Sequence, residues 1–155
     1  MRIQDWLKLS ALVATAGFVK WSAVVESAWL YRVFLYVPAA LLSVFGYGDY
    51  GESGGVYTFE TFVLDYSCAG VNFFLITLAV GCLAMLSAGR FYLILIPIAW
   101  FMTLAANTLR VGLYLKLELL AGHRPWLHEA TGILVFLTLL VAYYHLLMRR
   151  LHEEQ

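Results

Sequence analysis

Three stretches of this sequence run for 24, 19 and 19 residues without a Lys, Arg, Asp or Glu: residues 66–89, 91–109 and 130–148. An α-helix rises about 1.5 Å per residue, so about 20 apolar residues cross the ~30 Å hydrocarbon core of a membrane. In lipid every backbone N–H and C=O group must be paired within the protein, and a helix pairs them within one segment. We therefore predict three transmembrane helices over these stretches.

Two earlier stretches predict further membrane helices. Residues 29–44 are slightly short, but Arg32 can extend its charged end to the membrane surface and complete the crossing. Pro38 within this stretch predicts a kink, which membrane helices tolerate. Residues 6–25 are interrupted by Lys20. We favour a fifth crossing there over the alternative, an amphipathic helix lying on the membrane surface.

The composition agrees with a membrane protein. Of the 155 residues, 63% are hydrophobic and 13% are charged, whereas soluble domains have roughly 45–50% apolar and ~25% charged residues. This balance excludes a soluble domain, a disordered chain and a nucleic-acid-binding protein, and two cysteines are too few for a disulfide scaffold. We predict an all-α, polytopic membrane helix bundle of about five transmembrane helices, forming a single domain over residues 1–155.

The distribution of charge predicts an orientation. The loop over residues 46–65 contains four acidic and no basic residues, whereas Arg90, Arg149 and Arg150 lie beside the ends of the later spans. Basic residues favour the cytoplasmic side, so we place these arginines inside and the acidic loop outside. With five crossings, Lys20 and Arg32 fall inside as well, and Arg2 and Lys8 fall outside.

Two features of the acidic loop predict its local structure. Residues 46–55 contain five glycines, which is typical of turns. Residues 56–64 are rich in β-branched and aromatic residues, which favours an extended segment.

Three polar residues are placed by this topology at the outer edge of the membrane. Cys68 starts the third span, Arg110 ends the fourth, and His128 begins the last. Between the last two, residues 111–127 mix charged and apolar residues, which favours an interfacial helix and turn. Counting crossings therefore puts Cys68, Arg110 and His128 at one level.

Such a trio suits nucleophilic catalysis. A thiol attacks as the thiolate, which is stabilised beside His⁺ or Arg and at a helix N-terminus. His128 would take the thiol proton and return it to a leaving amine. Arg110 would stabilise an oxyanion or hold a carboxylate by two hydrogen bonds. A buried charge is costly in a membrane, so the presence of Arg110 at the end of a span requires an explanation.

Neighbouring residues fit a supporting role. Ser67 is the expected N-cap of the third span. Asn72 lies one helical turn after Cys68, and Asn107 lies three residues before Arg110, so either amide is a candidate to orient His128 or to donate to an oxyanion. Gly70 would let a substrate backbone approach the thiol.

Each residue also has a simpler interpretation. A cysteine in a membrane helix is usually a small apolar group, and an arginine or histidine at a span end is usually an anchor or a cap. We assign packing to Cys82 and no role to His145 and His152. A zinc site from Cys68, His123 and His128 is disfavoured because no carboxylate completes it, and we predict neither a metal nor a cofactor.

Three strings resemble the signatures of the exosortase/archaeosortase family of multi-pass membrane proteins. They are DYSCAGVNFF (residues 65–74), NTLR (107–110) and HEATG (128–132). The resemblance covers a core of about residues 66–148 and is greatest to the small forms labelled exosortase K. The longer members have about eight spans, more than this chain.

The resemblance implies a function. Members are thought to be transpeptidases that cut a C-terminal sorting signal from exported proteins, with a Cys, an Arg and a His in the active site. By motif, Cys68 is then the nucleophile, Arg110 the stabiliser and His128 the acid and base. The implied partners are membrane lipid and exported proteins with a transmembrane tail. The implied location is the bacterial cytoplasmic membrane, with the site facing outward. The alternatives are a non-catalytic scaffold or transporter subunit, and a thiol-dependent acyltransferase.

Overall fold

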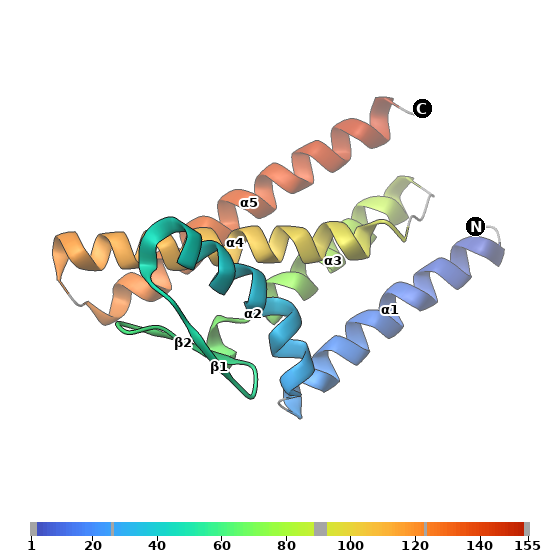
Figure 1. Cartoon of the computed structure of the whole chain (residues 1–155). Helices are drawn as coiled ribbons and strands as arrows, with labels where there is room; N and C mark the ends of the chain where they lie inside the picture. Colours follow the sequence, from blue (N-terminus) through green and yellow to red (C-terminus); the bar gives the residue numbers. More distant parts are fainter. Residues whose placement is uncertain (1–2, 26, 89–92, 123, 154–155) are drawn as a thin grey trace.

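A computed structural model describes residues 3–25, 27–88, 93–122 and 124–153. Over these residues the chain forms five α-helices, which Figure 1 shows in sequence colours: α1 (Ile3–Val24), α2 (Ala28–Leu42), α3 (Val71–Ala88), α4 (Leu95–Ala121) and α5 (Pro125–Glu153). Each helix, with its flanking turns, is long and apolar enough to cross a membrane. The predicted all-α bundle with about five such helices is confirmed.

Helix α4 is the centre of the bundle, because α2, α3 and α5 all pack against it. Small residues allow close packing between the helices, as is common in membranes. Ala99 and Ala106 on α4 are completely buried. At Gly81 on α3 a side chain would collide with the hydroxyl of Tyr143 on α5. A glycine at this point therefore sets how closely α3 and α5 approach each other.

Helix α4 does not end where the charge pattern predicts. It continues as one helix through Arg110 to Ala121, so residues 111–127 do not form the separate interfacial helix that we expected. The reason is local: the chain meets no strong helix breaker before Gly122, whose φ of 74° ends the helix. Pro125 then starts α5, where its fixed φ favours a first helical turn. Arg110 consequently lies within a long helix.

The acidic loop folds into a small antiparallel sheet. Helix α2 ends in a π-helical turn over Ser43–Tyr47, and strands β1 (Gly51–Ser53), β2 (Val56–Thr58) and β3 (Val63–Leu64) follow, paired in the order β1-β2-β3. Gly54 and Gly55 both have positive φ, which is what a tight turn between two strands requires. The predicted glycine turns and extended segment are both present.

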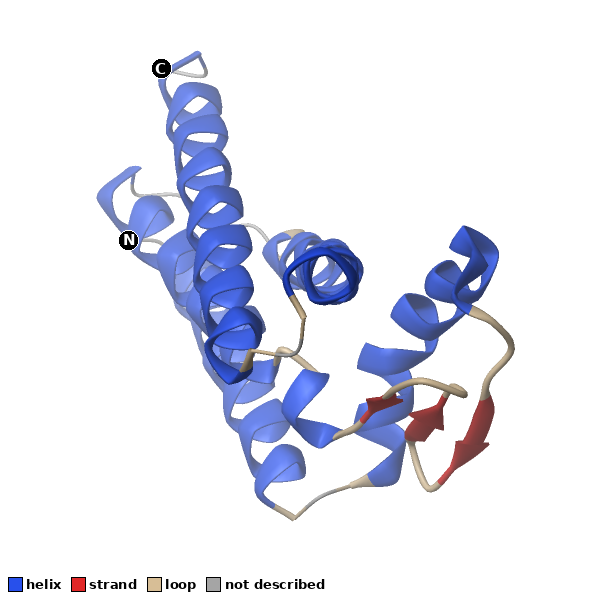
Figure 2. Ribbon diagram, turned by 90° about the vertical axis from the view of Figure 1, so that its left-hand side faces the viewer, coloured by secondary structure: helices blue, strands red, loops and turns tan. Residues whose placement is uncertain are grey.

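The two ends of α2 lie at the same end of the bundle. Near its start, the ring of Tyr31 lies 4.1 Å from the ring of Tyr66, directly before α3. Just beyond its end, the Tyr47 hydroxyl donates to the Gly112 carbonyl of α4 at 3.2 Å. Figures 1 and 2 show α2 running across the bundle axis, with the sheet beside it.

Two polar contacts agree with this arrangement and show that Lys20 and Arg32 lie at a different end of the bundle from the predicted one. Arg32 forms an ion pair with Glu52 of the acidic loop, with 3.0 Å between Nε and Oε1. Lys20 donates to the Asn72 side chain at the start of α3, at 3.5 Å. Lys20 and Arg32 therefore lie at the acidic-loop end of the bundle, and not opposite it as five simple crossings require. The end of α1, both ends of α2 and the start of α3 therefore all lie at the acidic-loop end of the bundle.

Candidate functional site

Cys68 lies on a 3-10 turn that precedes α3. The turn spans Tyr66–Cys68, and its N-cap is Asp65, whose Oδ1 accepts from the Ser67 backbone N–H at 2.9 Å and from the Ser67 hydroxyl at 2.6 Å. The expected cap, Ser67, is thus a donor to the actual cap. The Cys68 side chain is buried, and its Sγ lies 3.8 Å from the Ser67 Oγ.

Gly70 separates this turn from α3 and packs closely against α4. Its φ is 67°, and a Cβ placed on it would lie 2.7 Å from Oδ1 of Asn107. Glycine is required here because the Asn107 amide of α4 occupies the space where a Cβ would lie. Gly70 also lines the cavity described below, and its predicted contact with a substrate backbone stays a prediction. The break in the helix also means that Asn72 does not lie one continuous helical turn after Cys68.

Asn107 and Arg110 face the interior from one side of α4. Asn107 is fully buried and Arg110 is 6% exposed. Among the residues that the structure describes, Oδ1 and Nδ2 of Asn107 and Nε and Nη2 of Arg110 have no hydrogen-bond partner. Buried groups of this kind are normally paired, and an unpaired one carries a large desolvation cost. These atoms are therefore the strongest indication of a site.

Helix α5 covers the arginine. A Cβ on Gly132 would lie 3.4 Å from the Arg110 Cδ, so a residue of the HEATG string makes room for the side chain. The guanidinium lies over the Phe136 ring, 5.6 Å from its centroid, in a cation–π contact. This contact holds the guanidinium while leaving its N–H groups free to donate.

His128 lies on the first turn of α5, next to the same part of α4. Its ring packs edge-on against Tyr114 with 5.4 Å between centroids, and it lies within electrostatic range of Arg110 and Asp65. Within the described ranges no hydrogen bond joins His128 to Cys68, Asn72 or Asn107. The expected orientation of His128 by an asparagine is therefore not seen.

The contacts nevertheless gather the three motifs at one end of the bundle. The turn that contains Cys68 contacts α4 where Gly70 packs against Asn107, and α5 contacts α4 where Gly132 packs against Arg110. Since Asn107 and Arg110 are three residues apart on α4, the two contacts are separated by about 4.5 Å along the helix axis.

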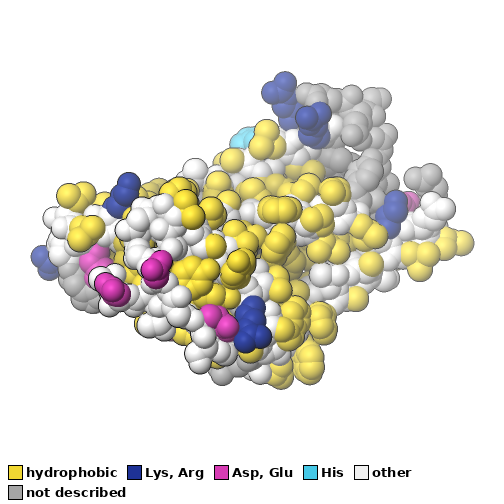
Figure 3. Space-filling model, viewed as in Figure 1, with side chains coloured by type: hydrophobic (Ala, Val, Ile, Leu, Met, Phe, Trp, Pro, Cys, Tyr) yellow, Lys and Arg dark blue, Asp and Glu magenta, His cyan; other side chains and the backbone are white. Residues whose placement is uncertain are grey.

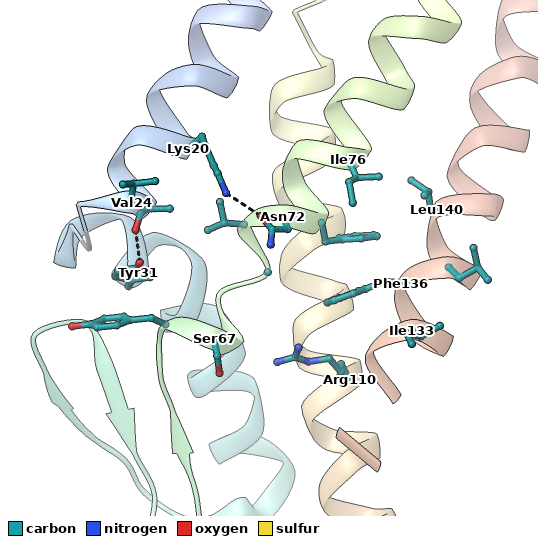
Figure 4. Close-up of a pocket in the computed structure, with 16 residues that line it drawn as sticks. Lys20, Val24, Tyr31, Ser67, Asn72, Ile76, Arg110, Ile133, Phe136 and Leu140 are labelled. Atoms are coloured by element: carbon teal, nitrogen blue, oxygen red, sulfur yellow. Dashed lines mark hydrogen bonds between the residues drawn. The ribbon is translucent and has the colours of Figure 1, made fainter. Parts of the chain in front are cut away.

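A cavity of about 640 Å³ opens beside this cluster, between α1, α3 and α5. Figure 4 shows Lys20, Ser67, Asn72 and Arg110 around its polar part, with the Arg110 guanidinium directed inward. Cys68 and His128 are not among the residues that line it. The cavity thus meets the site through Arg110 and the Ser67–Gly70 turn.

No group of three His, Cys, Asp or Glu residues is placed to hold a metal ion within the described part of the chain. His123, one member of the disfavoured zinc set, lies outside the described residues, as does Arg90 of the orientation argument. Cys82 is partly buried on α3, and His145 is exposed on α5.

Sequence reasoning missed four residues around the site. Lys20 enters the sequence argument only as an interruption of residues 6–25 and in the membrane orientation, although a single cation in an apolar run is a visible signal. Gly132 belongs to a quoted motif, but its contact with Arg110 depends on how α4 and α5 pack. Tyr114 and Phe136 are ordinary aromatic residues in an aromatic-rich chain, and nothing in the sequence marked them.

No protein-family model, curated protein or solved structure matches this chain.

Proposed function

We propose that the chain is a membrane-embedded, cysteine-dependent peptidase or transpeptidase that cleaves the C-terminal sorting signal of exported proteins. The observation that carries the proposal is the buried guanidinium of Arg110, which has unpaired N–H groups and packs against Gly132 and Phe136 of α5. A cation held in this way inside a membrane protein is expensive unless an anion forms beside it. The developing oxyanion of acyl transfer is such an anion.

The proposed reaction has two halves, formation of a thioester on Cys68 and its release, and the same three residues act in both. The Cys68 thiol gives its proton to His128, and the sulfur forms a bond to the carbonyl carbon of the substrate. Arg110 donates hydrogen bonds to the resulting oxyanion. The oxyanion then collapses, the C–N bond breaks, and His128 returns the proton to the leaving amine. In the second half, His128 takes a proton from water or from an acceptor amine, which forms a bond to the thioester carbonyl carbon. The C–S bond then breaks, and His128 returns the proton to the Cys68 sulfur. Catalytic hydrogen bonds often tighten only when substrate binds, so a direct Cys68–His128 bond is expected in the complex.

Supporting roles follow from the contacts. Asn107 holds the Gly70 turn against α4, so we propose that it positions Cys68, and its unpaired amide is a second candidate donor to the oxyanion. Asn72 lies in the cavity, where it contacts Lys20. We propose that Asn72 positions the Lys20 side chain in the cavity and does not orient His128.

The proposed location is the bacterial cytoplasmic membrane with the site on the outer face. Figure 1 shows both termini at the end of the bundle opposite the sheet. Lys8 near the start of α1 and Arg149 and Arg150 near the end of α5 are then on one side, and the positive-inside rule makes that side cytoplasmic. In this arrangement Lys8 is on the inner side, where the positive-inside rule favours it, whereas five crossings put it outside.

The test is capture of the acyl intermediate. The protein is co-expressed with an exported protein that ends in an apolar tail, and the peptide containing Cys68 is analysed by mass spectrometry. We expect a mass increment on Cys68 that neutral hydroxylamine removes, as it removes a thioester, together with a shortened substrate. Cys82→Ala is the matched control and should process normally, whereas Cys68→Ala should not.

The outcomes separate the alternatives. A scaffold or transporter subunit predicts no adduct and a silent Cys68→Ala, and that result would overturn the proposal. A fatty-acyl mass in place of a peptide would favour the thiol-dependent acyltransferase instead, because the same thioester chemistry serves both.

A further inference from the structure

The cavity between α1, α3 and α5 contains two cationic side chains and no acidic one. Lys20 reaches it from α1 and Arg110 from α4, and none of the lining residues is Asp or Glu. In the described ranges Lys20 contacts only the neutral amide of Asn72, and Arg110 has two N–H-bearing atoms without a partner. The polar end of the cavity therefore has positive charge that nothing in it balances.

The rest of the cavity is apolar, and its wall follows the axis of α5. From Arg110 its wall continues along α5 through Ile133, Leu137 and Leu140, and Ile76 of α3 faces them (Figure 4). Ile133 and Leu140 are seven residues apart, so the apolar wall extends about 10 Å along the helix. α1 and α5 both pack on α3 and lie on either side of it in Figure 4. The side chains of Ile76, Ile133 and Leu137 line the cavity and are exposed, so the mouth of the cavity lies on the outer surface of the bundle, which faces lipid in a membrane.

This combination suits an amphiphile with an anionic head. Arg donates a planar pair of hydrogen bonds to phosphate, and Lys adds a mobile second charge. Basic pockets between transmembrane helices bind lipid headgroups for this reason. A transmembrane peptide fits less well, because its backbone groups are paired within the helix and it carries no anion at membrane depth to balance Lys20 and Arg110.

We propose that this cavity binds the phosphate headgroup of an anionic membrane lipid, with Lys20 and Arg110 on the phosphate and an acyl chain along Ile133, Leu137 and Leu140. The site does not depend on the thiol chemistry proposed above, since Cys68 does not line the cavity. Lys20 belongs only to the lipid site, whereas Arg110 belongs to both the lipid site and the catalytic site. A substitution of Lys20 therefore tests lipid binding separately from catalysis.

The experiment measures lipid binding to the purified full chain in detergent by native mass spectrometry. The probes are short-chain phosphatidylglycerol, which is anionic, and phosphatidylcholine with the same chains. We expect tighter binding of phosphatidylglycerol and a loss of about tenfold in that affinity with Lys20→Gln, the scale of one charge-assisted hydrogen bond. Lys20→Arg should retain the affinity. Lys116→Gln, which removes an exposed cation of α4 outside this cavity, is the matched control and should be silent.

A second variant tests the apolar end without touching the charges. Ile133→Trp fills this end from a position that is 67% exposed, and it should weaken both lipids. Unchanged phosphatidylglycerol binding in Lys20→Gln, or an equal loss in Lys116→Gln, would overturn the proposal. So would Lys20-dependent binding of an apolar peptide with a free C-terminal carboxylate but not of lipid. Cys68→Ala should bind lipid normally but should not process the substrate. The two measurements therefore test the lipid site and the proposed catalysis independently.

Discussion

At the residue scale, the site is defined by side chains whose hydrogen-bonding capacity is unused. Asn107 and Arg110 are the clearest cases, since they are buried on one face of α4 and lack partners for four polar atoms. An unpaired buried polar group costs about 1–3 kcal/mol, and more when it is charged. A protein without a ligand for these groups would gain stability by replacing them, so their presence supports a functional role.

The Gly70–Asn107 contact is testable by stability. Gly70→Ala places a methyl group 2.7 Å from the Asn107 Oδ1 at a residue with φ of 67°. We expect a loss of about 1–3 kcal/mol, from left-handed strain and overpacking together. Gly112→Ala is the control, because its new methyl group would be 3.8 Å or more from its neighbours within a helix; it should be neutral or slightly stabilising. The measurement is thermal unfolding in detergent, and equal midpoints for the two variants would contradict the contact.

The roles of Arg110 and His128 are separable by kinetics. Arg110→Lys keeps the charge but loses the planar pair of donors, so processing should fall by roughly 10²–10³, the scale of one oxyanion donor. His128→Ala should cost roughly 10²–10⁴, the scale of general acid–base help. His145→Ala, an exposed histidine further along α5, is the control and should be silent. The readout is substrate processing with protein levels checked by blot. Normal processing by His128→Ala at wild-type level would exclude the proposed mechanism.

At the element scale, the placement of α2 decides the topology. Its 15 residues and the following turn are apolar and long enough to cross a membrane. Its ends, however, contact Tyr66 and Gly112, and those contacts belong to the same end of the bundle. We infer that α2 is embedded in the membrane edge and covers the site end of α3 and α4, while α1, α3, α4 and α5 cross.

Cysteine labelling tests this placement. In a background of Cys68→Ala and Cys82→Ala, single cysteines are introduced at exposed positions on both sides of α2, Val25→Cys and Ser53→Cys. A membrane-impermeant maleimide should label both from outside the cell. Gln4→Cys should be labelled only after permeabilisation. If α2 crossed the membrane, Val25→Cys and Ser53→Cys would be labelled from opposite sides.

The β1–β2 turn is tied to α2 by Glu52, which predicts a pH dependence. The pKa of Glu52 is held below its usual value first by the Gly55 backbone N–H, at 2.9 Å, and then by Arg32. A carboxyl with a lowered pKa in the fold contributes stability above its unfolded value of ~4.3, and this is lost as the pH falls through the folded value. We expect Glu52→Gln to have a lower melting temperature than the wild type at pH 6. The difference should disappear as the pH is lowered toward 3, because the wild-type carboxyl then becomes protonated. Glu60→Gln, at an exposed position of the same loop and outside the Arg32–Glu52 ion pair, is the matched control for the loss of a carboxylate.

At the scale of the whole molecule, the surface is that of a membrane protein. Large apolar side chains are exposed along all five helices. Figure 3 shows charged side chains at the two ends of the visible face and apolar ones between them. Water cannot solvate so large an apolar surface at acceptable cost, whereas lipid can.

Membrane integration has a direct measurement. Alkaline carbonate releases peripheral proteins from membranes, and we expect this chain to stay in the pellet and to be extracted only by detergent. Because four or more apolar helices are held in lipid, removing the charge of Arg32 or Lys20 should not change this result. Release of the unmodified chain by carbonate would contradict a multi-pass protein.

The sequence by itself determined the helices, because long charge-free stretches have no other way to satisfy their backbone in lipid. It also placed Cys68, Arg110 and His128 at one end of the bundle, since that requires only an even number of crossings between them. Tertiary structure decided the placement of α2, the contact between Gly70 and Asn107, and the position of Lys20 in the cavity. Each depends on which helix faces pack together, and that choice is made by side-chain shapes from segments far apart in the chain, which periodicity and charge do not encode.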